Sequence, residues 1–250
     1  MNTIKLHPLR KNQAGLWFLG QAGYIIRSCN RTIVIDPYLS DSVGKKDPDY
    51  ARAYPVPLEP EELEADILIV THDHLDHLDP DTITAYKHKK KTLFVAPRLA
   101  CRKLIKLGIN VENIARIDSG ETRIVKDVKI TGVYAIPNEA SVIDTAGYRI
   151  EFANGRSVYH SSDTGFSTLL LSAIPSAEVL LVCINGKFGN LNVQEAVRVT
   201  GAVKPTVAIP NHYDVMKKNA ADPKKFAAAM KKTHPRIRVE IMPVLKPFIW

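Results

Sequence analysis

Histidines and aspartates are concentrated in one short stretch of the chain, THDHLDH at residues 71–77. Three of the eight histidines lie there, with Asp73 and Asp76 between them. Imidazole and carboxylate groups are ligands of Zn, Mn and Fe, whereas a purely structural zinc site usually contains cysteine. The stretch has no cysteine and directly follows the apolar run DILIV at residues 66–70. Its composition indicates a metal centre that performs chemistry.

The local structure of this stretch decides whether its side chains can meet. The residues that could bind a metal are His72, His74, Asp76 and His77. A regular helix would scatter them around its surface, whereas an irregular loop can turn them toward one point. The apolar run before them reads as a buried strand, and Asp79-Pro80 after them supplies the N-cap and first residue of a helix. We therefore expect a ligand loop, with a merely solvated polar loop as the alternative.

Two halves of the chain are each expected to form a sheet. In the first half, the runs at residues 16–28 and 31–37 are rich in β-branched and aromatic residues, and the polar pair Cys29-Asn30 between them suits a hairpin. In the second half, Asn154-Gly155 is a strong hairpin signal between two further strands. A helix over residues 193–203 follows, for which Asn192 and Glu195 form a capping box. One α/β domain over residues 1–250, with two sheets covered by helices, is the expected architecture.

Composition narrows the class of protein. The 250 residues are 45% hydrophobic, enough to bury the core of one large domain. The three cysteines form no C-x-x-C pair, so we expect neither a disulfide framework nor a thiolate zinc site, and a reducing cytoplasm fits best. The N-terminus lacks the apolar core of a signal peptide, and no run approaches the roughly 18 residues that span a bilayer. No membrane partner is expected.

The net charge of +8 favours anionic partners, which include phosphorylated metabolites and nucleic acid. The basic run at residues 86–91 lies where a helix would end, a position at which cations complement the helix dipole. The lysines of residues 224–232 flank the apolar face of a second helix. Both runs read as solvated surface, so we expect a small anionic metabolite rather than nucleic acid. A homo-oligomer remains open.

The pattern H-x-H-x-D-H at residues 72–77 resembles the signature of the metallo-β-lactamase superfamily. Other segments that resemble its branch containing L-ascorbate-6-phosphate lactonase are WFLGQAGYIIR (17–27), VIDPYLSD (34–41), YHSSDTG (159–165), INGKFGNLN (184–192) and IPNHYDVM (209–216). The resemblance extends along nearly the whole chain. It implies a four-layer αββα sandwich, which agrees with the order of elements given above.

The resemblance also implies a set of metal ligands. The residues that match the family's ligands are His72, His74, Asp76, His77, Asp163 and His212. The first two match one metal site, Asp163 matches the carboxylate that bridges both sites, and the others match the second site. Asp36 matches an acidic residue that orients the ligands, although it could equally cap the turn that follows it.

One ligand of the first site is missing from the pattern. Where the family has a histidine, this chain has Asn138, and an amide oxygen is a weaker ligand for a transition metal than imidazole. We therefore expect a weak or empty first site. His160 is a candidate replacement, but it lies three residues before Asp163, so in a regular strand the two would point to opposite faces. The remaining histidines, His7, His88 and His234, read as surface residues.

The loop at residues 185–192 lies between a strand and a helix, a position where ligands often meet an α/β sheet. Lys187 could contact an anionic substrate, with Asn185 and Tyr213 as further candidates. A structural turn that ends in the Asn192 cap explains the loop equally well.

These features favour a metal-dependent hydrolase that uses one or two divalent ions, Zn or Mn first and Fe as an alternative. Asp76 and Asp163 would carry the catalytic chemistry. Within the branch that the chain resembles, the substrate class is a small anionic ester or a phosphorylated sugar lactone. Two alternatives remain: a phosphodiesterase or nuclease of the same fold, and a metal-binding regulatory protein that lost catalysis with the histidine at position 138.

Overall fold

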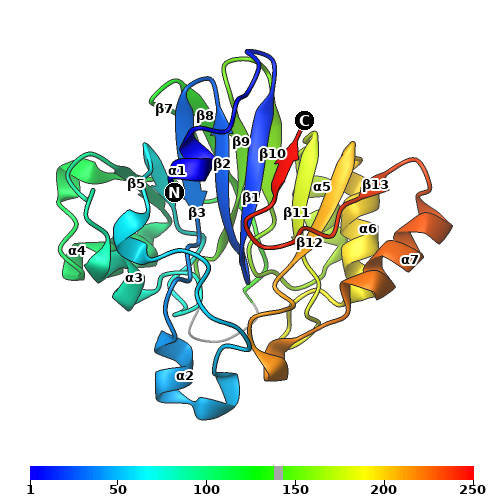
Figure 1. The fold of residues 1–250 in the computed structure, drawn as a ribbon. Coiled ribbons are helices and arrows are strands. Elements are labelled where there is room, and N and C mark those ends of the chain that lie inside the picture. Colours follow the sequence, from blue (N-terminus) through cyan, green and yellow to red (C-terminus); the bar gives the residue numbers. More distant parts are fainter. Residues whose placement is uncertain (138–142) are drawn as a thin grey trace.

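Two seven-stranded sheets form the centre of this computed structural model, which describes residues 1–137 and 143–250 (Figure 1). In spatial order, the first sheet consists of β14 (Pro247–Ile249), β1 (Ala14–Gly20), β2 (Gly23–Ser28), β3 (Arg31–Ile35), β4 (Ile67–Ile69), β5 (Leu93–Ala96) and β6 (Ile114–Arg116). The second consists of β13 (Arg238–Val239), β12 (Val207–Asn211), β11 (Val179–Cys183), β10 (Ser157–His160), β9 (Ala146–Glu151), β8 (Val128–Tyr134) and β7 (Thr122–Val125).

The two sheets repeat one pairing scheme. In the first sheet, β14, β1, β2 and β3 pair antiparallel, and β3 to β6 pair parallel. In the second, β7 to β10 pair antiparallel, and β10 to β13 pair parallel. Parallel neighbours end at the same edge of a sheet, so the loops after β3, β4, β10, β11 and β12 can meet there.

Helices cover the outer faces of both sheets (Figure 1). The helices are α1 (Asn2–Lys5), α2 (Ser42–Lys46), α3 (Pro80–Ala85), α4 (Arg98–Lys106), α5 (Thr168–Ala173), α6 (Val193–Val203) and α7 (Pro223–Thr233). Short 3-10 turns are η1 (Pro48–Tyr50), η2 (Pro60–Glu62), η3 (Val111–Asn113) and η4 (Lys217–Asn219). The pair α3 and α4 packs on the first sheet, and α5, α6 and α7 pack on the second.

Alternating side chains divide the apolar core into three layers. On β1, Leu16 and Phe18 point between the sheets, while Trp17 and Leu19 point to the helices that cover the first sheet. This alternation is the period of a strand buried on both faces. The predicted αββα sandwich is thereby confirmed.

Most local predictions are confirmed, with one difference in the first run of strands. The hairpin at Cys29-Asn30, the capping box of Asn192 and Glu195 and the helix over residues 193–203 are all present. The run at residues 16–28, however, is not one strand: it reverses direction at Gln21 between β1 and β2. The tight turn depends on Gly20 at φ +94°, where any side chain would be strained.

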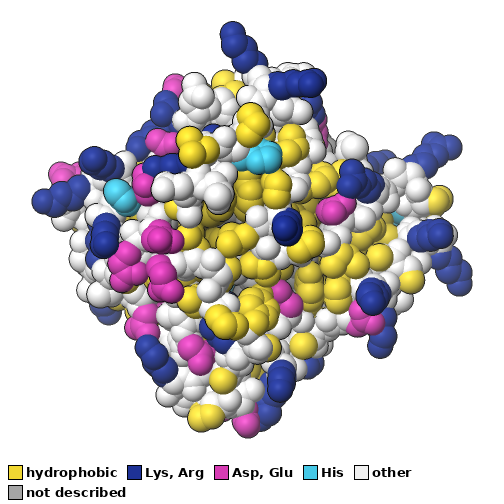
Figure 2. All heavy atoms as spheres, viewed as in Figure 1, with side chains coloured by type: hydrophobic (Ala, Val, Ile, Leu, Met, Phe, Trp, Pro, Cys, Tyr) yellow, Lys and Arg dark blue, Asp and Glu magenta, His cyan; other side chains and the backbone are white. Residues whose placement is uncertain are grey.

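Charged and apolar side chains separate on the surface. Figure 2 shows hydrophobic side chains gathered over β14 and the segment that leads into it, with lysine and arginine mainly toward the periphery. Lys224, Lys225, Lys231 and Lys232 of α7 are exposed, as predicted for a solvated helix face. Among the residues that the structure describes, no helix combines the length and apolar composition needed to cross a bilayer.

Candidate metal centre

Four ligand atoms from three loops converge on one point. His212 Nε2 lies 3.2 Å from Asp163 Oδ1, 3.3 Å from Asp76 Oδ2 and 3.3 Å from His77 Nε2. His77 Nε2 lies 3.4 Å from Asp163 Oδ1 and 3.7 Å from Asp76 Oδ2. Ligand atoms about 2.0–2.2 Å from a tetrahedral ion lie roughly 3.3–3.6 Å apart. The spacing therefore fits a single transition-metal ion.

The two oxygens of Asp163 have different surroundings. Oδ2 accepts a hydrogen bond of 2.7 Å from Nδ2 of Asn190. Oδ1 is buried and accepts no hydrogen bond from the described residues. A buried carboxylate oxygen without a donor is costly unless a cation occupies its lone pairs. This oxygen is the one that faces the two histidines, so its environment also fits a bound metal.

Asp36 and Thr71 fix the orientation of the His77 ring. His77 Nδ1 lies 2.7 Å from Asp36 Oδ2, and Thr71 donates to the same carboxylate through its backbone nitrogen at 2.8 Å and its hydroxyl at 2.6 Å. A hydrogen bond from Nδ1 leaves Nε2 available as the ligand atom, the usual arrangement at metal-binding histidines. The contact expected of an orienting residue is therefore present at Asp36.

The electrostatic field at the cluster of four candidate ligands favours positive charge. Burial disfavours the protonated His77 ring, but Asp163, Asp76 and Asp36 together outweigh burial and raise its pKa well above the usual value. The same balance between burial and Asp163 raises the pKa of His212. Burial opposes the charge on Asp163, yet the two histidines hold its pKa well below the usual range. Such a cluster suits a divalent cation.

A ligand atom of His72 lies within 4.8 Å of those of His77 and Asp163, and beside these four ligands His72 and His74 form a smaller group. Their Nε2 and Nδ1 atoms are 3.1 Å apart, and the other His72 nitrogen lies 3.0 Å from the Thr71 hydroxyl. Burial and the nearby His77 lower the pKa of His72 to about 3, so its ring is a neutral ligand at neutral pH. Asn138 lies outside the described residues, so its place in a first metal site stays a prediction.

His160 is held in another role. Its Nε2 lies 2.9 Å from the carbonyl oxygen of Ala22, and its Nδ1 accepts a hydrogen bond of 3.0 Å from the backbone nitrogen of Ser162. Both ring nitrogens therefore have protein partners, which excludes His160 as a ligand in this conformation. The expectation that His160 and Asp163 point to opposite faces of one strand does not apply, because β10 ends at His160 and Asp163 lies beyond the strand. His7, His88 and His234 are partly exposed, in agreement with their predicted place at the surface.

A cavity of about 220 Å³ opens over the ligand cluster. The residues that line it are Val43, Tyr50, His74, Asp76, Asp163, Phe188, Asn190, His212, Met216 and Asn219. One wall is apolar and aromatic, with Phe188 and Tyr50 at a ring distance of 6.0 Å. Its lining includes the candidate ligands His74, Asp76, Asp163 and His212 and the amides of Asn190 and Asn219, whereas His77 is buried and does not line it. These four candidate ligands thus lie where a small molecule can reach them.

The predicted substrate residues lie behind or beside this cavity. Asn185 is buried and donates a 2.7 Å hydrogen bond to Asn219. Lys187 donates to the backbone carbonyl of Lys218, next to the lining residue Asn219. Tyr213 packs into the core under the second sheet, its ring stacked 6.2 Å from that of Phe18. Tyr213 is not among the described residues that line the cavity, and a direct substrate contact stays a prediction for all three residues.

Two polar residues of the centre were not predicted. Asn190 holds Asp163, and Gln21 donates to Asp76 Oδ2 at 2.8 Å. A signal for Gln21 exists in the sequence, because it is the single polar residue between Gly20 and Gly23 in an otherwise apolar run. For Asn190 no comparable local signal exists, since its role depends on a contact with a loop 27 residues away.

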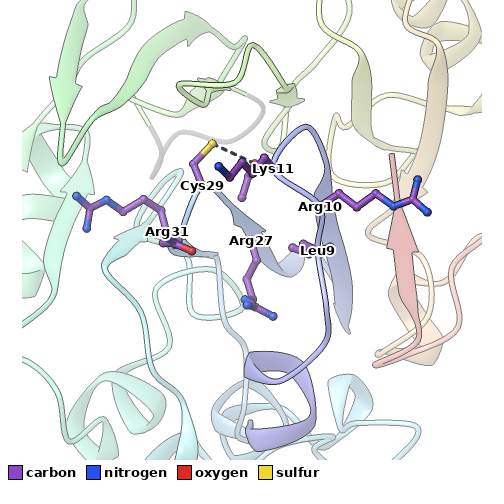
Figure 3. Close-up of a pocket in the computed structure, with 8 residues that line it drawn as sticks. Leu9, Arg10, Lys11, Arg27, Cys29 and Arg31 are labelled. Atoms are coloured by element: carbon purple, nitrogen blue, oxygen red, sulfur yellow. Dashed lines mark hydrogen bonds between the residues drawn. The ribbon is translucent and has the colours of Figure 1, made fainter.

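A second cavity, of about 420 Å³, lies at the hairpin of β2 and β3 and has a basic lining (Figure 3). Arg27 donates to the carbonyls of Ile4 and His7, and Arg31 bonds to Lys126 and Asp127. Figure 3 shows the side chains of Arg27 and Arg31 pointing away from each other. Because these cations do not converge and have partners, this cavity offers no comparable site.

Sequence comparison relates the chain to known hydrolases. The family described as Beta-lactamase superfamily domain matches residues 31–213. The UPF0173 metal-dependent hydrolase MK1542 of Methanopyrus kandleri is 31% identical over 219 residues, which cover 84% of this chain and 88% of that protein. The family match at residues 31–213 includes the ligand loop, Asp163 and His212.

Solved structures show the same fold at lower identity. Igni18, a metallo hydrolase from Ignicoccus hospitalis, has a TM-score of 0.77 at 18% identity, covering 95% of this chain and 98% of its own. The isothiocyanate hydrolase from Delia radicum gut bacteria has a TM-score of 0.74 at 15% identity, covering 94% and 98%. At these identities the two structures establish the shared architecture and leave the substrate open.

Proposed function

We propose that this chain, which belongs to the metallo-β-lactamase superfamily, hydrolyses small anionic esters or lactones. The chain is a metal-dependent hydrolase of that superfamily, so the proposal concerns its substrate and the roles of its residues. The observation that carries the proposal is the convergence of Asp76, His77, Asp163 and His212, three of which line a small cavity.

Each ligand has a defined part in this reaction. Two histidine nitrogens and two carboxylates supply four ligands with a total charge of −2, which balances a divalent ion such as Zn²⁺ or Mn²⁺, with Fe²⁺ as an alternative. When bound, that ion would need a water molecule as a fifth ligand, and it would lower the pKa of that water to about 7 and polarise the scissile carbonyl or phosphoryl group. Asp36 keeps the His77 ring in place, and Asn190 keeps Asp163 from rotating.

The size of the cavity supports a small substrate. Its volume of about 220 Å³ lies below the roughly 300–1,000 Å³ of sites that hold drug-sized ligands. A nucleic-acid strand needs a basic groove along its backbone, and no lysine or arginine is among the described residues that line this cavity. The size and lining therefore favour a metabolite over the nuclease alternative.

Two lysines beside the cavity support an anionic substrate. Lys218 Nζ lies 5.8 Å from the centre of the Tyr50 ring, which lines the cavity, and Lys187 bonds to the carbonyl of Lys218. Asp49 neutralises one of the two charges through its ion pair with Lys218. The positive charge of Lys187 beside the cavity would attract a phosphate or carboxylate group of a lactone or ester. A phosphorylated sugar lactone, as in the branch that the sequence resembles, meets these requirements.

A substrate screen with matched pairs tests the proposal. The protein is stripped of metal, reloaded with Zn²⁺, Mn²⁺ or Fe²⁺, and assayed on lactones, phosphomonoesters and phosphodiesters, each lactone with and without a phosphate group. We expect metal-dependent hydrolysis that favours the phosphorylated member of each pair. His77→Ala should abolish the activity, whereas His88→Ala, which changes a partly exposed histidine, should retain it.

Two results would favour the alternatives. Cleavage of single-stranded or duplex DNA without turnover of small esters would support a nuclease. Stoichiometric metal binding without turnover of any compound in the screen would support a regulatory protein. Equal rates on charged and uncharged lactones would remove the anionic part of the proposal.

A further inference from the structure

Gln21 touches two of the metal ligands although it is not one of them. Its amide nitrogen donates to Asp76 Oδ2 at 2.8 Å and lies 3.3 Å from His212 Nε2. Its backbone carbonyl accepts a 2.7 Å hydrogen bond from the backbone nitrogen of His212. One buried residue thus contacts ligands that arrive on two separate loops, after β4 and after β12.

The backbone at this contact is held in an uncommon conformation. Gln21 and His212 have φ angles of +55° and +58°, a region that residues other than glycine rarely adopt. The preceding Gly20 has no space for a side chain, since a Cβ there would lie 2.4 Å from the Tyr54 hydroxyl oxygen. Conformations of this kind persist where surrounding contacts fix them, and they are concentrated at functional sites.

Asp214 and Tyr54 hold the turn at Gln21 through hydrogen bonds. Asp214 Oδ1 accepts a 3.1 Å hydrogen bond from the Gln21 backbone nitrogen, and Asp214 Oδ2 accepts one of 2.7 Å from the Tyr54 hydroxyl. Tyr54 belongs to the segment between η1 and η2. The hydrogen bonds therefore form a chain from Tyr54 through Asp214 and Gln21 to the ligand Asp76.

Asp76 is the ligand that most needs such support. Its side chain is 16% exposed, compared with 9% for Asp163, 2% for His212 and 0% for His77. An exposed carboxylate can rotate toward water and present either oxygen. A donor on Oδ2 restricts that rotation and leaves a second lone pair of the same oxygen for a cation.

We propose that Gln21 is a positioning residue that holds Asp76 Oδ2 at the metal, and that Asp214 and Tyr54 hold Gln21 in turn. The inference rests on the proposed function only in requiring that the cluster binds a divalent ion. Gln21 would act on the metal ion indirectly, by holding the ligand Asp76. Its loss should therefore weaken metal binding even when no substrate is present.

Gln21→Met tests this role, because methionine matches glutamine in length, keeps the backbone bonds and removes the amide donor. The probe is Co²⁺ alone, measured by its visible absorption and by competition with a chromophoric chelator. We expect the dissociation constant to rise roughly 10–100-fold, the range found for partners that orient metal ligands. Tyr54→Phe, which touches no ligand, should raise it by a smaller factor.

Two controls separate positioning from general stability. Gln13→Met changes a glutamine near the opposite end of β1 and should leave Co²⁺ binding unchanged. The metal-free unfolding temperature of Gln21→Met should stay close to that of the wild type, while the stabilisation by added Co²⁺ decreases, because that increment follows the dissociation constant. If Gln21→Met fails to fold, the smaller effect of Tyr54→Phe on the Co²⁺ spectrum still decides the question.

Wild-type affinity and an unchanged Co²⁺ spectrum in both variants would overturn the inference, as would an equal loss in Gln13→Met. These measurements need no substrate, so they are independent of the substrate screen. A protein that binds Co²⁺ but hydrolyses none of the esters would contradict the substrate class and leave the role of Gln21 testable. A wild type that binds no Co²⁺ would overturn both proposals.

Discussion

The two groups of metal ligands differ in how many parts of the chain build them. Asp76 and His77 come from one loop, and Asp163 and His212 come from two others in the second sheet. His72 and His74, by contrast, are neighbours in the same loop. The four residues of the larger group meet only when both sheets are assembled. His72 and His74 meet within one loop, although a ligand atom of His72 also lies within 4.8 Å of those of His77 and Asp163.

Supporting contacts follow the same division. Asp36 holds His77, Asn190 holds Asp163, and Gln21 holds Asp76. For the smaller group, the Thr71 hydroxyl lies beside His72. Ligands whose orientation is fixed before binding lose less entropy when the metal arrives. The larger group should therefore bind metal first and more tightly.

Replacing His77 should cause the largest loss of metal affinity and activity. His77→Ala removes the ring that lies within 3.7 Å of three other ligand atoms, so we expect metal affinity to fall by more than about 100-fold and most activity to be lost. Asp163→Ala should behave similarly. Elemental analysis after dialysis, together with rates on the best ester, measures both effects.

His72→Ala provides the contrast, since it removes a ligand of the smaller group. We expect it to retain the more tightly bound metal ion. Wild-type metal content in both His77→Ala and Asp163→Ala would show that the ligand assignment is wrong. Equal losses in His72→Ala and His77→Ala would remove the difference between the two groups.

Asp36→Asn should have the next largest effect. Asparagine keeps the size of the side chain but lacks the negative charge that holds the Nδ1 proton of His77, so the ring loses its fixed tautomer. We expect metal affinity to fall about 10–100-fold. Isothermal titration with Zn²⁺ into the metal-free variant measures the change. A residue that only capped the following turn would lower the unfolding temperature and leave the affinity unchanged.

Residues close together in the sequence were the easiest part of the site to predict. The ligand loop, the hairpin at Cys29-Asn30 and the helix cap at Asn192 depend on local chemistry, which the sequence displays directly. Asp163 and His212 lie far from the loop, and only the family resemblance connected them to it. The fold class followed from the order of strands and helices.

Contacts between distant loops were not predictable in this way. Gln21 and Asn190 act through partners 55 and 27 residues away, and no spacing rule connects such pairs. Tyr213 lies next to His212 in the sequence, but its side chain packs in the core and is not among the described residues that line the cavity. Neighbours on an irregular loop can face opposite ways, so adjacency to a ligand does not establish access to the cavity.

Asn138→His should convert the smaller group into a complete site. Asn138 lies outside the described residues, so this prediction depends on the sequence alone. We expect the wild type to retain close to one metal ion per chain after dialysis and the variant to approach two, because a third imidazole strengthens binding by His72 and His74. Rates need not rise, since a single ion can serve in hydrolysis. Two ions in the wild type, unchanged in the variant, would show that another residue completes the first site.

Phe188→Ala should have the smallest effect, because it changes the wall of the cavity and leaves both groups of ligands intact. Phe188 is 47% exposed at the edge of the cavity, with its ring 6.0 Å from that of Tyr50. Truncation removes part of the apolar surface available to a bound substrate, which corresponds to about 1 kcal/mol, or roughly fivefold in KM. We expect this rise for esters with an apolar group, with metal content and kcat unchanged. Leu169→Ala, which changes an exposed apolar residue on α5, is the matched control and should leave KM as it is. A loss of metal in Phe188→Ala would instead mean that the wall and the ligands are not independent, and a uniform rise in KM for all esters would mean that Phe188 shapes the entrance without recognising the apolar group.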